Sequence, residues 1–252
     1  MMNEVKNILQ KFDGISLKEM DSVKLMNRTD TKFIFRIEQL PQILEEVKSD
    51  YLVLDVEGTR ASKYKTLYYD TEDFQMYMQH QNKKLNRNKV RYREYVESSL
   101  NFFEIKFKSN KDRTHKERIK RDAIETEITG KASEFLQKKT NFDAHDLFPK
   151  LWIDYCRITL VNKKESERLT IDMNLKFYNE NKQKGLSEIV IAELKQERRS
   201  NTAFIEVMRR HHIRTASISK YCFGIMFLYE NIKKNNFKSK LLTLNKIRYG
   251  TI

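Results

Sequence analysis

Charged and apolar side chains alternate between Arg91 and Lys108, and this alternation limits most strongly what the chain can fold into. The segment reads RYREYVESSLNFFEIKFK, two stretches of strand-forming residues joined by a short polar turn. Side chains two positions apart on a strand lie on the same face. Arg91 and Arg93 therefore share one face of the first stretch. In the second stretch, one face carries Glu104, Lys106 and Lys108, and the opposite face is apolar. Taken alone, such a row usually indicates a solvated sheet face.

The same spacing of two recurs in four other segments of the chain. They read RTDTKFIF, DYCRITLV, ERLTIDMNL and IVIAELKQE, and they begin at residues 28, 154, 167 and 189. Five mostly basic rows on separate strands indicate one surface that is lined from many sides. A closed barrel with a charged interior gives this pattern, because inward and outward residues alternate along every strand. Packed cations are costly to desolvate unpaired, so we expect a polyanion inside, with a few carboxylates left to hold a metal.

Hydrophobic periodicity predicts about eight strands with helices around them. The helices are expected at residues 3–27, 38–49, 74–84, 131–140, 201–212 and 219–232. The basic segment KDRTHKERIKRD is left open between a loop and a strand. This pattern predicts an α+β fold, a closed antiparallel eight-stranded β-barrel with helices packed outside. We expect a single domain over residues 1–252, with a helical segment at 1–27 and closing helices at 200–252.

The net charge of +14 indicates an anionic partner, namely phosphate chains, nucleic acid or an acidic membrane. Cys156 and Cys222 are too few for a disulfide framework, so reduced thiols in a cytoplasmic protein are expected. The most apolar window, YCFGIMFL, is far shorter than the roughly 20 residues that a membrane helix needs. We therefore expect no membrane span in this chain. A membrane-protein partner and the oligomeric state stay open.

Eight segments between about Arg28 and Gly224 carry a resemblance to a known family. They read RTDTKFIF, TLYYDTEDF, KVRYREY, FFEIKFK with KERIKR, YCRITL, ERLTIDMNL, IAELK and SISKYCFG. In this order they resemble the catalytic domain of the vacuolar transporter chaperone (VTC) proteins, which are polyphosphate polymerases. That domain belongs to the triphosphate tunnel metalloenzymes, a CYTH-like superfamily. RTDTK stands where the cyclase-type relatives carry E-x-E-x-K.

The resemblance implies roles for individual residues. It implies phosphate binding by Lys32, Arg91, Arg93, Lys106, Lys116, Arg118, Tyr155, Arg157, Arg168, Lys195, Ser219 and Lys220. Catalytic roles are implied for Lys32, Arg91, Arg93, Lys106, Arg157, Arg168 and Glu193. Glu193 is also the implied ligand of a divalent metal, Mg²⁺ or Mn²⁺, with Glu104 as the second candidate. Without the resemblance, Glu193 and Lys195 could equally be an exposed cross-strand pair of little energetic value.

The implied reaction transfers the terminal phosphate of ATP to a growing inorganic polyphosphate chain. Such a transfer needs positioning and charge neutralisation more than covalent catalysis, which suits a basic interior. Two alternatives stay open: hydrolysis of tripolyphosphate or a nucleoside triphosphate on the same fold, and a non-enzymatic polyphosphate-binding module. We expect no nucleic-acid partner, because no recognition motif with stacking aromatic residues is evident.

Overall fold

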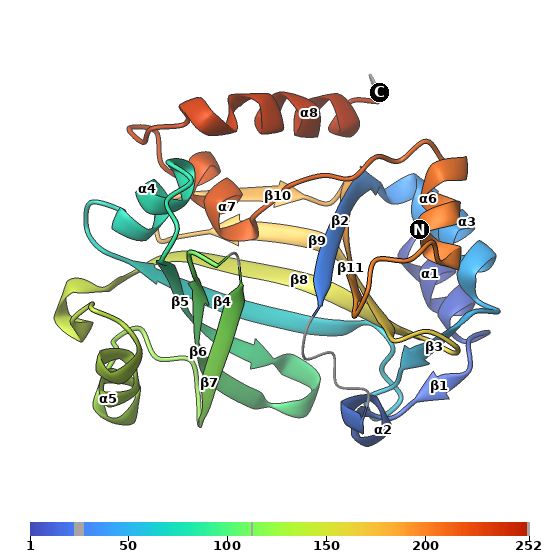
Figure 1. The fold of residues 1–252 in the computed structure, drawn as a ribbon, viewed down its shortest axis with the longest axis horizontal. Helices are drawn as coiled ribbons and strands as arrows, with labels where there is room; N and C mark the ends of the chain where they lie inside the picture. The colour runs from blue at the N-terminus through green and yellow to red at the C-terminus, as the bar shows by residue number, and fades with distance from the viewer. Residues whose placement is uncertain (23–27, 112, 251–252) are drawn as a thin grey trace.

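A long, strongly curved sheet organises the protein (Figure 1). The structure is a computed structural model that describes residues 1–22, 28–111 and 113–250. Along the main path of the sheet, every neighbouring pair of strands is antiparallel. In spatial order the strands are β2 (Thr29–Arg36), β11 (Ile189–Gln196), β9 (Glu167–Tyr178), β8 (Phe148–Asn162), β4 (Ser62–Asp70), β5 (Arg87–Tyr95), β6 (Leu100–Lys108) and β7 (Thr114–Arg121).

Three short strands extend this sheet at its margins. β10 (Gln183–Leu186) pairs with β9 in antiparallel fashion. β3 (Tyr51–Leu54) pairs with the far end of β8, and β1 (Gly14–Ile15) pairs with β3 in the single parallel pairing among the described strands. The basic segment that the sequence left between loop and strand is β7, although Asp112 lies outside the described residues.

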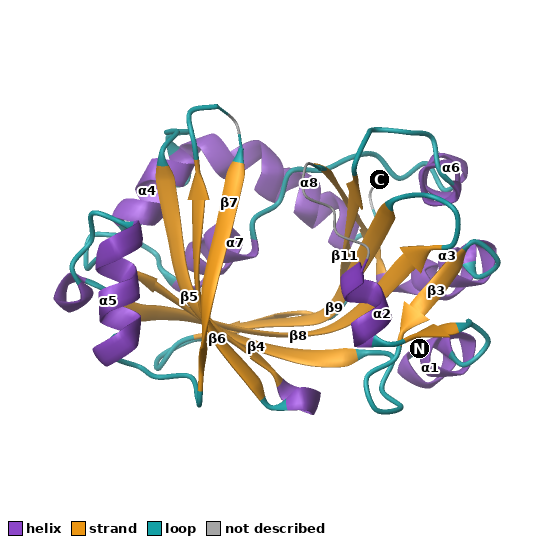
Figure 2. Ribbon diagram, turned by 60° about the horizontal axis from the view of Figure 1, so that its bottom comes forward, coloured by secondary structure: helices purple, strands orange, loops and turns teal. Residues whose placement is uncertain are grey.

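The prediction of a closed barrel is wrong. No pairing joins β2 to β7 in the part of the chain that the structure describes, so the sheet is open between its two end strands. Figure 2 shows β5, β6 and β7 rising on one side of the curved sheet and β11 on the other. Six of the eight β7 residues are exposed, and four of these six are charged. Charged edge strands resist pairing with another strand, which is a physical reason for the open edge.

Three helices pack together at one end of the sheet (Figure 1). They are α1 (Met2–Leu9), α3 (Leu40–Val47) and α6 (Ala203–Arg210), and they bury Leu9, Leu44 and Phe204 against Leu169 of β9. Each such apolar side chain contributes about 1.5–3 kcal/mol on burial. The single helix predicted over residues 3–27 is wrong, because α1 ends at Leu9 and is followed by β1 and α2 (Leu17–Ser22). Residues 23–27 of that prediction lie outside the described residues.

The remaining helices pack against the other strands. α5 (Gly130–Lys139) packs beside β5 and β6, where Leu136 contacts the core around Phe103. α4 (Gln75–Gln81), α7 (Lys220–Leu228) and α8 (Lys238–Arg248) share a core with β8 and β9. The sequence predicted only two helices after residue 200, so α8 is an addition. No helix in the described ranges has the length and apolarity that crossing a bilayer requires.

The inner face of the sheet is divided between a core and a charged surface. On β8, Leu151 and Ile153 lie in the core with α7, whereas Tyr155 and Arg157, further along the same face, line a cavity. α7 approaches β8 very closely, because a Cβ atom at Gly224 would lie 2.5 Å from the Leu151 side chain. A larger residue at this helix position would force the Leu151 and Phe177 side chains to shift, so the glycine allows the close packing that leaves the start of α7 beside the charged half of the face.

Candidate functional site

The charged half of the inner face forms a cavity of about 440 Å³. Five arginines and eight lysines line it, against only two lining carboxylates among the described residues. Eleven residues predicted to bind phosphate or metal are brought together here: Lys32, Arg91, Arg93, Lys106, Lys116, Tyr155, Arg157, Glu193, Lys195, Ser219 and Lys220. They come from β2, β5, β6, β7, β8, β11 and the start of α7. Such an excess of positive charge is suited to an anion that carries several charges.

Glu104 lies beneath this lining and holds three of its cations. Its side chain is 1% exposed, and Arg91 Nη2 lies 2.6 Å from its Oε2. Lys116 Nζ lies 2.5 Å from Oε1, and Arg93 Nη1 lies 3.9 Å from Oε2. Burial alone would raise the pKa of Glu104, but the three cations hold it well below its usual value. Both carboxylate oxygens therefore contact cations, and metal binding by Glu104 stays a prediction.

Asp172 of β9 plays the same part for two other cations. Arg157 binds it with both ends of its fork, at 2.5 Å from Nε to Oδ1 and 2.8 Å from Nη2 to Oδ2. Lys220, the first residue of α7, pairs with Oδ2 as well. These cations lower the pKa of Asp172 in spite of its burial. The sequence did not predict this role of Asp172, because the pairing depends on how β9 lies against β8 and α7.

Glu193 of β11 is the more accessible carboxylate. Its side chain is 18% exposed, and it lies 3.3 Å from Lys195 Nζ and 3.7 Å from Lys32 Nζ. Against the effect of burial, these lysines and Lys106 hold the pKa of Glu193 well below its usual value. Its oxygens can therefore reach the cavity in the ionised form that a divalent metal requires.

The donor set fits a metal that takes most of its ligands from a substrate. The described residues contain no group of three or more His, Cys, Asp or Glu side chains that could hold a metal. Mg²⁺ is commonly bound through one or two carboxylates, with substrate phosphates and water supplying the other oxygens. Glu193 by itself can supply the one carboxylate that such a site needs from the protein.

Two other lysines of the cavity are held by serine hydroxyls instead of carboxylates. Lys89 Nζ donates to Ser219 Oγ at 2.9 Å, and Lys240 Nζ donates to Ser217 Oγ at 3.0 Å. Burial, with help from neighbouring cations, lowers the pKa of both lysines. We call these two the serine-backed lysines. The carboxylate-backed cations are those paired with Glu104, Asp172 or Glu193, namely Arg91, Arg93, Lys116, Arg157, Lys220, Lys195 and Lys32.

Lys106 and Tyr155 also lack a partner that matches their chemistry. Lys106 has no carboxylate within ion-pair distance in the described part of the chain, and burial beside Arg91 lowers its pKa to about 8. The buried hydroxyl of Tyr155 has no hydrogen-bond partner among the described residues. The Tyr155 ring stacks on Tyr64 at 5.2 Å, and the guanidinium of Arg157 lies 5.3 Å from it. An anion in the cavity would satisfy both polar groups.

The start of α7 adds a further attraction for anions. Ser219 is the N-cap of α7, and its Oγ accepts a hydrogen bond from Cys222 N at 3.3 Å. The amino ends of helices carry partial positive charge and unsatisfied N–H groups, which favour phosphate. Lys220 follows in the first turn of the helix and adds a full charge.

Two predicted phosphate-binding residues do not line the cavity. Arg118 of β7 is exposed and covers the ring of Phe102 at 4.2 Å. Arg168 of β9 donates from Nη2 to the carbonyl oxygen of Met20 at 3.2 Å, which attaches α2 to the sheet. Phosphate binding by these two arginines stays a prediction.

Several lining residues were not predicted from the sequence. They are Tyr68, His80, Arg87, Lys89, Ser217 and Lys240, among others. Arg28, Asp30 and Lys108 belong to the predicted charged rows and also line the cavity, although no phosphate-binding role was predicted for them. Arg87 and Lys89 continue the Arg91–Arg93 row at the same spacing of two, so this signal was present in the sequence. Burial and the surrounding cations lower the pKa of His80 to about 2, which makes it a neutral member of the lining.

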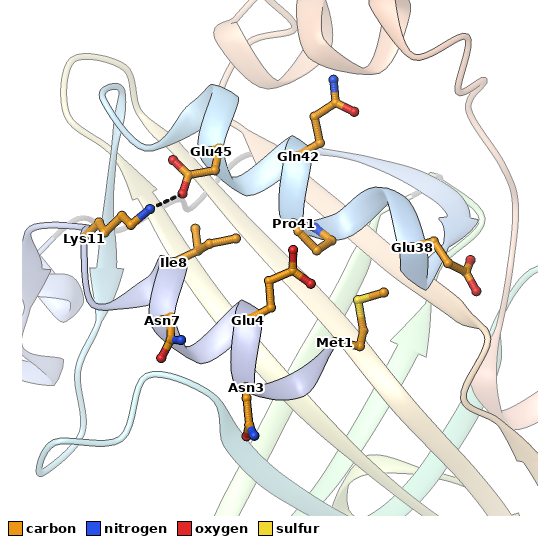
Figure 3. A pocket seen from close by; sticks show the side chains of 10 residues that line it. All are labelled: Met1, Asn3, Glu4, Asn7, Ile8, Lys11, Glu38, Pro41, Gln42 and Glu45. Carbon is orange, nitrogen blue, oxygen red and sulfur yellow. Dashed lines mark hydrogen bonds and ion pairs between the residues drawn. The ribbon is translucent and has the colours of Figure 1, made fainter.

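A larger hollow of about 800 Å³ lies elsewhere, between α1 and α3 (Figure 3). Its charged lining consists of Glu4, Glu38, Glu45 and Lys11, and Lys11 pairs with Glu45 at 2.6 Å. Three carboxylates against one lysine repel phosphate. This hollow therefore differs in charge from the basic cavity and does not share its chemistry.

Solved structures of other proteins share the fold of this chain. Among solved structures, a candidate adenylate cyclase from Bacillus halodurans is 12% identical over 81% of this chain and all of its own, with a TM-score of 0.50. A candidate adenylyl cyclase from Hippeastrum, described as having a dominant triphosphatase activity, is 9% identical over 82% of this chain and 98% of its own, also with a TM-score of 0.50. At such identities the likeness concerns the fold alone.

Sequence comparisons identify a family for this chain. No curated protein sequence matched the chain. A family model described as "VTC domain" matches residues 27–229, which is most of the chain and contains all strands of the main path. The chain therefore belongs to the VTC domain family.

Proposed function

We propose that the cavity binds linear phosphate chains, and that the protein transfers the terminal phosphate of ATP to a growing inorganic polyphosphate chain. The observation that carries this proposal is the charge imbalance of the lining, thirteen lysines and arginines against two carboxylates among the described residues. A linear phosphate chain carries negative charge along its whole length, so it can compensate cations that several strands present. The membership of the VTC domain family supports the same reading.

The arginines are suited to orient the reacting phosphates. Arg91, Arg93 and Arg157 present planar forks, which bind phosphate oxygens in a bidentate way. Glu104 and Asp172 hold these forks from behind and limit their motion. A preorganised group of cations stabilises the charge that spreads over the transferred phosphoryl group. The arginines would therefore contribute to positioning and to transition-state stabilisation together.

In the proposed reaction, a terminal oxygen of the accepting chain forms a bond to the terminal phosphorus of ATP. The bond from that phosphorus to its bridging oxygen breaks, and ADP leaves. When bound, Mg²⁺ or Mn²⁺ supplies charge neutralisation at the phosphate oxygens. Glu193 would hold it, because this carboxylate combines ionisation with partial exposure to the cavity.

Hydrolysis of tripolyphosphate or of a nucleoside triphosphate is the second candidate. The Hippeastrum protein of similar fold is described as having a dominant triphosphatase activity, and this description supports hydrolysis as the second candidate. In that case water would replace the phosphate chain as acceptor, while the binding of the triphosphate by the cavity would be the same.

One assay distinguishes these reactions. Purified protein is incubated with ATP and Mn²⁺, and the products are analysed for long-chain polyphosphate on a gel, for ADP and for free phosphate. Polymerase activity gives polyphosphate together with ADP. Free phosphate without polyphosphate would indicate a hydrolase. Binding of tripolyphosphate without any turnover would support a non-enzymatic polyphosphate-binding module and would contradict the proposal.

A further inference from the structure

Helix α8 supplies a cation to the cavity from outside the region that the family model matches. That match covers residues 27–229, whereas α8 spans Lys238–Arg248. Lys240 and the neighbouring Phe237 both line the cavity, and Lys240 Nζ lies 5.5 Å from the centre of the Phe237 ring. The wall at this end of the cavity is therefore built in part by a segment beyond the matched region.

α8 is attached to the rest of the protein at several points. Leu244 is fully buried in the core that α8 shares with α7. Near the end of the helix, Arg36 Nη1 of β2 donates to the Arg248 carbonyl at 3.2 Å, and Arg248 pairs with Glu188. Before the helix, Asn236 Nδ2 donates to the Gln81 carbonyl at 3.0 Å. Contacts at both ends and in the middle fix the position of α8, so the location of Lys240 is a property of the fold.

The cations of β5 form a row, and Lys89 and Arg87 at one end of it act together with Lys240 on His80 and Cys222. The row therefore leads toward this end of the cavity. Arg93, Arg91, Lys89 and Arg87 alternate along the strand, and all four line the cavity. Because a strand rises about 3.3–3.4 Å per residue, the row extends over about 20 Å. This length exceeds that of three linked phosphoryl groups. A triphosphate held near Arg93 would therefore not reach the Arg87 end of the row. A longer chain bound along the row would place phosphoryl groups there.

The groups that compensate the positive charges change along this row. Arg91 and Arg93 are compensated by Glu104, whereas Lys89 is held by a serine hydroxyl. Lys240 has the same arrangement as Lys89, and it has no carboxylate within ion-pair distance in the described part of the chain. The Lys240 side chain is half-buried, and partial desolvation without a counter-charge disfavours the charged form of an ammonium group and lowers the pKa of this lysine. An anionic ligand would supply the missing charge.

We propose that Lys240 of α8 forms a distal subsite for the phosphoryl groups of a chain longer than triphosphate. This inference rests on the proposed function, because it assumes that the cavity binds linear phosphate. The subsite makes the affinity depend on chain length: longer chains gain the contact with Lys240, and triphosphate, bound among the carboxylate-backed cations, does not. α8 thereby contributes to the choice between short and long chains.

The test compares two ligands and two lysines of the same helix. Tripolyphosphate and a size-fractionated, longer linear polyphosphate are titrated calorimetrically into wild-type protein, Lys240→Gln and Lys238→Gln. Lys238 is exposed and does not line the cavity, so it is the matched control for loss of one positive charge. We expect Lys240→Gln to lower the affinity for the longer chain about tenfold relative to tripolyphosphate, the usual value of one charged hydrogen bond. Lys238→Gln should leave this ratio unchanged.

Three results would overturn the subsite. They are an equal loss for both ligands in Lys240→Gln, no loss for either, or the same change in ratio in Lys238→Gln. Lys240→Arg, which keeps the charge, should restore the ratio if the ammonium group acts through charge, and failure of this rescue would contradict the assignment. If wild-type protein binds neither tripolyphosphate nor the longer polyphosphate, the proposed function is overturned together with the subsite. If wild-type protein binds both and only the Lys240 result fails, the subsite alone is overturned.

Discussion

The carboxylate-backed cations and the serine-backed lysines occupy the same cavity but differ in how their charge is compensated. Arg91 lies 2.6 Å from the buried Glu104, whereas Lys89, two residues away on the same strand, donates to the hydroxyl of Ser219. An ion pair with a buried carboxylate keeps a cation charged and in place. A hydroxyl keeps it in place only. The carboxylate-backed cations therefore supply fixed geometry, and the serine-backed lysines supply charge that a ligand must neutralise.

The largest effect is expected at Glu193, which is the most exposed of the three carboxylates that hold the carboxylate-backed cations. Glu193→Gln keeps the size of the side chain but removes the charge that a divalent metal requires. We expect the metal-dependent turnover of ATP to fall by about a hundredfold or more, as for the loss of one strong electrostatic contact. Binding of tripolyphosphate without metal should persist or tighten, because a negative charge has left the cavity. Turnover at the wild-type rate would remove Glu193 from the mechanism.

A large effect on stability is expected at Glu104, which is buried beneath three cations. Glu104→Gln leaves Arg91, Arg93 and Lys116 without their counter-charge, and breaking a buried ion pair in this way costs about 3 kcal/mol or more. The control is Glu117→Gln on β7, whose exposed ion pair with Lys139 contributes at most about 1 kcal/mol. Denaturant unfolding without ligand measures both. Equal, small losses would show that Glu104 does not compensate these cations.

A smaller effect is expected from pH, because two cavity groups titrate near pH 8. Burial and Arg91 lower the pKa of Lys106 to about 8, and Arg91 and Arg93 outweigh burial to lower that of Tyr68 to about 8. As the pH rises through 8, Lys106 loses positive charge and Tyr68 gains negative charge. Affinity for phosphate chains should therefore fall.

The stability of the ligand-free protein should change in the opposite direction. Between pH 8 and the unfolded pKa values near 10, the unfolded chain binds more protons at Lys106 and Tyr68 than the folded chain does. Stability therefore rises with pH in this window. Melting temperatures with and without tripolyphosphate on either side of pH 8 measure both trends. In Lys106→Met the fall in affinity should be smaller, and an unchanged pH profile in this variant would exclude Lys106 as its source.

Features that depend on neighbouring residues could be predicted from the sequence. Alternation along a strand is a local property, so the sequence predicted charged strand faces that carry Arg91, Arg93 and Lys106. The family resemblance implied the role of Glu193, and the structure brings all four residues to one cavity. The membership of the VTC domain family was recognised from short motifs in order, and the family match confirms it. The α+β class with an antiparallel sheet is likewise confirmed.

What the sequence did not predict depends on contacts between distant segments. Closure of the barrel requires β2 and β7 to meet, and no local pattern reports whether two end strands pair. The buried positions of Glu104 and Asp172 beneath their cations follow from the stacking of β6, β9 and α7. Lys240 lies on a weakly amphipathic helix whose sequence gives no sign that it reaches the cavity. Arg118 looked equivalent to Lys116 in sequence, yet its side chain covers Phe102.

Binding of linear phosphate by the cavity is tested most directly by a metal-free calorimetric titration of tripolyphosphate into the wild-type protein. Uncompensated positive charge in the cavity predicts binding of one tripolyphosphate per protein, with an affinity that falls steeply as salt is added. Occupied cations should also raise the melting temperature, because a ligand that binds only the folded state stabilises it. Absence of binding at low salt, or binding that salt and Arg93→Ala leave unchanged, would show that the cations of the cavity do not bind linear phosphate.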